Sequence, residues 1–88
     1  MSGNVGCLAR SLAGRDAGII CLILREEDEN VFIADGRDRR VETPKKKNRK
    51  HVRLITGENG EPIRFSGEAL TNRFLRNWLR EQAGRVQV

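Results

Sequence analysis

The chain has 88 residues and a formal net charge of +5, with 17 Lys and Arg against 12 Asp and Glu. This length allows one small domain with a limited core, and the longest apolar run, 19–24, is far too short for a membrane-spanning helix. Its first residues do not combine a basic segment with an apolar one, so we expect no secretory signal and a cytoplasmic location.

The first predicted elements are two strands separated by a turn-rich loop. Residues 5–10 form a short, half-polar strand candidate. Residues 19–24 are apolar on both faces, which is typical of a strand buried inside a sheet or barrel. In the loop between them, Gly14 and Gly18 are predicted structural turn residues, because glycine adopts positive φ without a steric penalty.

An acidic hairpin and further short strands follow. The stretch 26–30 is expected to be a solvated hairpin tip, and because it repels phosphate it should lie away from any RNA-binding face. A third strand over 31–34 leads into a turn at Gly36, and an alternating pattern resumes over 51–55. Several short strands joined by tight loops predict a small, strongly bent β-barrel.

Basic residues are concentrated in one segment. Nine of the Lys and Arg residues, against two acids, lie between positions 37 and 53. This concentration favours a polyanionic partner, with nucleic acid first. Because the predicted basic loop, 37–50, contains no aromatic residue, we expect it to contact the phosphate backbone of folded RNA rather than stack on bases. The residues predicted to bind RNA are Arg10, Arg15, Arg37, Arg39, Arg40, Lys45, Lys46, Lys47, Arg49, Lys50 and His51.

The last segment is predicted to be an amphipathic helix. Its apolar residues recur at helical spacings, namely Leu70, Phe74, Leu75, Trp78 and Leu79. Thr71 is the expected N-cap, although Ser66 could start the helix earlier, and Gly84 should end it. The arginines of the other face, Arg73, Arg76 and Arg80, either extend the positive surface or form a solvated helix face. Phe32 and Phe65 fit core positions.

No catalytic or metal-binding pattern is present. Cys7 and Cys21 have apolar neighbours and are predicted to be buried free thiols. Together with His51 they provide too few ligands for a zinc site. Since the sequence has no nucleophile-base pair and no phosphate-binding loop motif, we expect neither an enzyme nor a cofactor or small-molecule substrate.

The first two thirds of the chain resemble a known family. Val5-Gly6, the loop from Gly14 to Gly18, the apolar strand after it and the segment 31–36 resemble a KOW domain, over about Val5 to Ile55. Similar proteins are the KOW-bearing large-subunit ribosomal proteins of archaea and eukaryotes. The resemblance implies an SH3-like β-barrel and RNA or ribosome binding without catalysis.

These observations combine into one expectation. We predict a mainly β protein, with a small SH3-like β-barrel of the KOW type over 1–56, a linker over 57–65, and a C-terminal amphipathic α-helix and tail over 66–88. The expected partner of the monomer is RNA, either ribosomal RNA or a ribosome-associated RNA. An alternative stays open, in which the protein is an SH3-like interaction module that binds an acidic protein partner.

Overall fold

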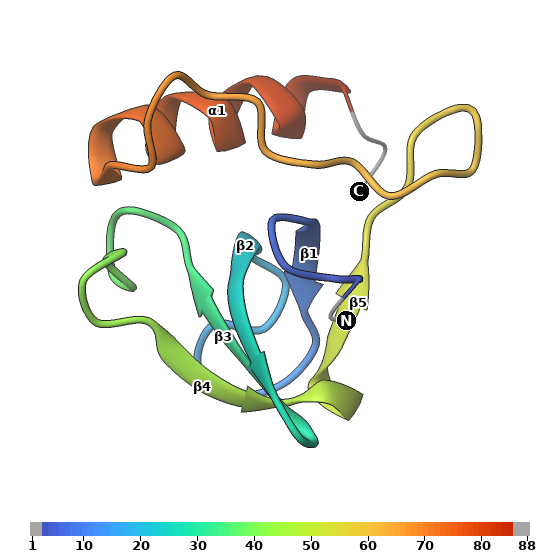
Figure 1. Ribbon diagram of the computed structural model, residues 1–88, viewed down its shortest axis with the longest axis vertical. Helices are drawn as coiled ribbons and strands as arrows, with labels where there is room; N and C mark the ends of the chain where they lie inside the picture. Colours follow the sequence, from blue (N-terminus) through green and yellow to red (C-terminus); the bar gives the residue numbers. More distant parts are fainter. Residues whose placement is uncertain (1–2, 86–88) are drawn as a thin grey trace.

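A computed structural model describes residues 3–85 (Figure 1). Its elements are β1 (Leu8–Ser11), β2 (Ile20–Glu27), β3 (Asn30–Ala34), β4 (Lys45–Asn48), the 3-10 helix η1 (Arg49–His51), β5 (Val52–Leu54) and α1 (Asn72–Arg85). The five strands form one antiparallel sheet in the order β4-β3-β2-β1-β5, and this sheet is not closed. The predicted mainly β fold with a C-terminal helix is confirmed.

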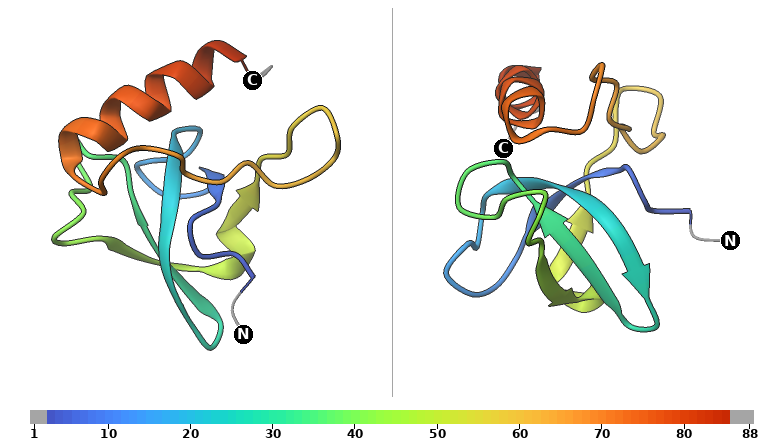
Figure 2. Two further views of the ribbon diagram at one scale, coloured as in Figure 1. Left: turned by 45° about the horizontal axis from the view of Figure 1, so that its top comes forward. Right: turned by 60° about the vertical axis from the view of Figure 1, so that its left-hand side comes forward.

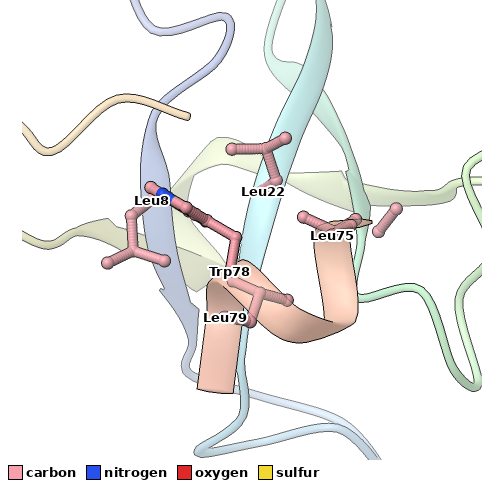
Figure 3. Packing of buried hydrophobic residues seen from close by; sticks show 6 residues of the cluster. Leu8, Leu22, Leu75, Trp78 and Leu79 are labelled. Atoms are coloured by element: carbon pink, nitrogen blue, oxygen red, sulfur yellow. The ribbon is translucent and has the colours of Figure 1, made fainter. Parts of the chain in front are cut away.

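The sheet buries apolar side chains on both of its faces, because side chains alternate along each strand. On one face Leu8 and Leu22 pack against Leu75, Trp78 and Leu79 of α1, as Figure 3 shows. On the other face the curled sheet encloses a second cluster of Ala9, Cys21, Ile23, Val31 and Ile33. The prediction that 19–24 is buried on both sides is therefore confirmed for β2.

Helix α1 lies across the sheet in both views of Figure 2. Thr71 is its N-cap, as predicted, because its Oγ1 accepts a hydrogen bond from the Phe74 N–H at 3.2 Å. Trp78 donates from its indole nitrogen to Ser66 Oγ at 3.1 Å and meets the Phe65 ring edge-on. The prediction that Gly84 ends the helix is wrong: its φ is not positive, and α1 runs through it to Arg85.

The predicted basic loop is partly regular structure. Lys45–Asn48 forms β4, which pairs with β3 from Ile33 opposite Lys45 to Asn30 opposite Asn48. The next three residues form η1. Apolar alternation does not reveal this strand, because the residue that it turns into the interior is Lys47, whose side chain is only 8% exposed.

Two aromatic residues lie outside the core positions predicted for them. The β2–β3 register shifts between Ile23 and Arg25, a bulge that places Arg25 opposite Phe32. The Arg25 guanidinium carbon lies 4.1 Å from the centroid of the Phe32 ring, which is only partly buried. Phe74, predicted for the apolar stripe of the helix, is 37% exposed.

The predicted linker is attached to the sheet. Ile63 O accepts a hydrogen bond from Leu8 N at 2.8 Å, and Phe65 N donates to Gly6 O at the same distance.

Cys7 and Cys21 are both buried and free, as predicted, and burial raises the pKa of the Cys21 thiol to about 12. Between residues 3 and 85 no helix combines the length and apolarity needed to cross a membrane.

Candidate nucleic-acid interface

The loop after β1 meets the loop after β3 at one buried carboxylate. The Asp16 side chain is 9% exposed, and its Oδ1 accepts a hydrogen bond from Ser11 Oγ at 3.1 Å and lies 2.7 Å from Lys47 Nζ. Its Oδ2 lies 3.7 Å from Arg39 Nε. Asp16 therefore links β1, β4 and both loops through one group.

The surroundings of the Asp16 carboxylate favour its ionised form in the folded protein. Desolvation raises the pKa of Asp16, but hydrogen bonds from Lys47 and Ser11 lower it by more, so the pKa lies below its ordinary value. The Lys47 ammonium group also donates to Ala13 O. Lys47, predicted to bind RNA, therefore has its charge neutralised inside the protein and holds the loop after β1 in place.

The loop after β3 is folded around Asp35 and held against α1. The Asp35 carboxylate accepts hydrogen bonds from the backbone N–H groups of Arg37 at 2.8 Å and Arg39 at 3.0 Å, which is a typical Asx turn. Gly36 follows with φ +79°, and its carbonyl accepts a hydrogen bond from Arg76 at 2.7 Å. This geometry leaves the Arg37 side chain exposed beside the helix.

Five arginines from both loops and the helix share one surface. A hollow of about 270 Å³ is lined by Arg37, Arg76 and Arg80, and a second of about 290 Å³ by Arg15 and Arg39. Both hollows also include Ile19, so they adjoin. We call this region the arginine surface; its members are Arg15, Arg37, Arg39, Arg76 and Arg80.

The arginine surface has the chemistry to bind phosphate groups. Its guanidinium groups outnumber the acids of the two hollows, which are Asp35, Asp38 and the buried Asp16. Two of these carboxylates are already engaged, Asp16 by Lys47 and Asp35 by backbone N–H groups. Because each guanidinium presents several N–H donors in a planar fork, the surface can hold several phosphate oxygens at once.

Other predicted RNA-binding residues are exposed but lie apart from the arginine surface. Lys45 and Lys46 project from β4, and Lys50 and His51 belong to η1. None of these four lines either hollow of the arginine surface. Arg40 is exposed and lies 3.4 Å from a Glu42 oxygen.

The acidic hairpin tip lies beside the basic segment rather than far from it. Arg49 forms an ion pair with Glu26 and donates to the Asp28 carbonyl at 2.6 Å. The Arg49 backbone N–H also donates to Glu29 O at 2.8 Å. The position of the tip follows from the pairing of Asn30 with Asn48, which brings the start of β3 to the end of β4. The Glu26 carboxylate therefore competes with any phosphate for Arg49.

The remaining predicted residue, Arg10, is on β1. It donates to Gly18 O at 2.6 Å and stands directly opposite Arg53 of β5. Sequence reasoning identified Arg15, Arg37 and Arg39 but left the role of the helix arginines open. The pairing of Asp16 with Lys47 was not predicted, because no sequence pattern joins these two residues.

The chain was also compared with known proteins. No family model matches it, and no curated protein gives a significant match.

Proposed function

We propose that this is a non-catalytic RNA-binding protein that holds the phosphate backbone of a folded RNA, ribosomal or ribosome-associated, on the arginine surface. The observation that carries the proposal is the convergence of Arg15, Arg37 and Arg80, all exposed, from two loops and a helix. The resemblance to KOW domains supports it, and the five-stranded antiparallel sheet is in keeping with the mainly β part of the fold that this resemblance implies.

Recognition in this proposal depends on the shape of the RNA rather than on its unpaired bases. Trp78 and Phe65 pack in the core, and Arg25 lies over the ring of Phe32. These aromatic residues are therefore not free to stack on unpaired RNA bases. We propose that the protein binds as a monomer in the cytoplasm and positions RNA through its backbone.

A matched pair of variants tests the assignment. R15Q/R37Q/R80Q removes three charges from the arginine surface, whereas K45Q/K46Q/K50Q removes three from the exposed part of the basic segment. Filter binding to a structured RNA hairpin should show Kd at least tenfold higher for the arginine variant, and a smaller change for the lysine variant. Equal losses would mean that net charge alone attracts the RNA, and a wild-type protein that does not bind at low salt would refute the proposal.

Salt dependence gives a second measurement on the same proteins. If the five arginines each neutralise one phosphate, the plot of log Kobs against log salt should have a slope between roughly −3.5 and −4.5. The arginine variant should lose about 2 to 3 of this slope. A slope that is the same for the two variants would contradict the assignment of the site.

A second candidate function is favoured by one observation. Leu70 precedes α1 and Phe74 lies in its first turn, next to Arg73 in the sequence, and the two apolar residues are 47% and 37% exposed. An acidic protein partner with an apolar contact could dock there, as an interaction module would require. Affinity capture from a lysate with and without nuclease separates the two, because a protein partner survives loss of the RNA.

A further inference from the structure

A larger hollow lies on the other side of α1 from the arginine surface. Its volume is about 740 Å³, and α1 contributes Gln82 and Arg85 to it rather than Arg76 and Arg80. We call it the β5 groove; its lining includes Arg10, Arg53, Ile55, Glu58, Gln82 and Arg85. Most of this lining comes from residues to which the proposed function assigns no role.

Two of its arginines are held side by side by the register of the sheet. Arg10 and Arg53 are directly paired residues of the antiparallel strands β1 and β5. Such paired side chains lie on the same face of a sheet, so two like charges face each other, which is unfavourable without a counterion. Arg10 donates one hydrogen bond, to Gly18 O, and within residues 3–85 no carboxylate forms an ion pair with either arginine.

Gln82 adds a polar side chain to the lining of the groove. Its amide has two N–H donors and a carbonyl acceptor. A ligand in the groove can therefore form hydrogen bonds with it.

The charge balance of the groove selects an anion. Three guanidinium groups, of Arg10, Arg53 and Arg85, face one carboxylate, that of Glu58. The C-terminal end of α1 adds a partial negative charge of about one half, which opposes an anion but is smaller than the remaining positive charge. A dianionic phosphate monoester would gain more from this field than a singly charged phosphodiester.

The dimensions and the apolar wall indicate how large the ligand is. Small-molecule sites are commonly hollows of about 300 to 1,000 Å³ with an apolar wall and a few polar groups, and the β5 groove has that character. Its apolar wall includes Ile55 and Ile63. A free phosphate ion would leave most of this wall and the Gln82 amide without contact.

We propose that the β5 groove binds a nucleotide-sized phosphate monoester. Arg10 and Arg53 hold the phosphate group, the apolar wall covers the rest of the ligand, and Gln82 hydrogen-bonds to its polar edge. A free mononucleotide and the 5′-terminal nucleotide of an RNA chain both present this chemistry.

Calorimetric titration of the full chain with adenosine 5′-monophosphate, inorganic phosphate and adenosine tests the proposal. The monophosphate should bind at least tenfold more tightly than phosphate or adenosine, because only it contacts both the arginines and the wall. Equal affinities for the three, or no binding of the monophosphate, would overturn the proposal.

Two variants test the named residues. R53Q and Q82L should each raise the Kd for adenosine monophosphate about tenfold or more, a difference typical of hydrogen bonds to charged or buried groups. Neither should lower the thermal midpoint without ligand, since R53Q removes a like-charge contact and Q82L keeps a side chain of similar size. R73Q is the control, because Arg73 is exposed and lines neither the β5 groove nor the arginine surface. Its Kd for adenosine monophosphate should equal that of the wild type. Wild-type affinity in both R53Q and Q82L would refute the assignment.

A last comparison separates the two sources of the ligand and the two sites. A 5′-phosphorylated trinucleotide that binds tenfold more tightly than the mononucleotide assigns the groove to an RNA end, whereas an equal or weaker affinity assigns it to a free nucleotide. Removal of the 5′ phosphate without any loss of trinucleotide affinity would contradict both. R15Q/R37Q/R80Q should keep wild-type affinity for the mononucleotide, so this proposal and the proposed function can fail separately.

Discussion

The two halves of the basic segment carry the same sign of charge but differ in how the fold uses it. In the first half, Arg37 is exposed beside α1 and Arg39 lies at the edge of the second hollow. In the second half, Lys47 is buried against Asp16, and Arg49 is engaged by Glu26. A run of basic residues in a sequence is therefore not one binding site, because strand register determines which of its charges remain free to contact a phosphate.

The largest expected effect comes from breaking the buried pair. K47M leaves the Asp16 carboxylate buried without its partner, which should cost about 3–5 kcal/mol of unfolding free energy. K46M changes an exposed neighbour on the same strand and should stay within about 0.5 kcal/mol of wild type. Urea unfolding followed by circular dichroism measures both.

A double variant controls for general damage to the strand. D16L/K47M replaces the pair with apolar side chains and should regain most of the stability lost in K47M, since paired removal is often neutral. If K47M and K46M unfold at the same urea concentration, Lys47 is not buried as described.

The next effect should come from separating the loop after β3 from the helix. In G36A the added methyl group would lie 2.6 Å from the Asn72 carbonyl oxygen, at a φ of +79° that alanine rarely adopts. The strain and the displaced helix should together cost about 2–4 kcal/mol. RNA affinity should fall as well, because Arg37 and Arg76 would no longer share a hollow. G60A also changes a glycine of positive φ but has open space around it, so it should leave RNA affinity unchanged.

Acid should weaken the buried pair in a defined direction. The pKa of Asp16 in the folded protein is below its ordinary value of 3.8, so its contribution to stability is complete above that pH. The contribution is lost as the pH falls through the lower, folded-state pKa. Unfolding free energies measured between pH 5 and pH 2 should therefore fall more steeply for wild type than for D16N. Parallel curves for the two proteins would contradict the role of Asp16.

The smallest effect should come from releasing Arg49. E26Q removes the carboxylate that forms an ion pair with this arginine. Desolvation raises the pKa of Glu26, but hydrogen bonds from Asn4 and Arg49 lower it below its ordinary value, so these interactions with the charged form are lost as well. Stability should fall by about 1 kcal/mol, because Arg49 is partly exposed. RNA affinity should rise about two- to threefold in filter binding as one more cation becomes available. E27Q, at an exposed position nearby, should change RNA affinity less.

The apolar elements could be predicted from the sequence, whereas the strand with a polar interior position could not. The core strand β2 and the stripe of Leu75, Trp78 and Leu79 follow from apolar periodicity and are found as predicted. Strand β4 does not follow from apolar periodicity, because its interior position is occupied by a lysine whose partner, Asp16, lies 31 residues earlier in the chain. A local pattern carries no information about such a pairing.

The candidate sites depend still more on tertiary register. Arg15 and Arg37 could be proposed from charge alone, but the approach of Arg76 and Arg80 to them requires the packing of α1 on the sheet. The cross-strand pair of Arg10 and Arg53 requires the β1–β5 register. The displaced Phe32 follows from a bulge in β2 that the composition of the strand does not indicate.

Trp78 is the one tryptophan of the chain, and its position gives the molecule a built-in optical reporter. The residue is 7% exposed, packs between α1 and the sheet, and its indole is hydrogen-bonded to Ser66. If the helix detaches while the strands persist, the emission maximum should shift to the red before the far-ultraviolet signal of the strands is lost. Undocking of the C-terminal layer can thus be followed without a label and separately from melting of the sheet.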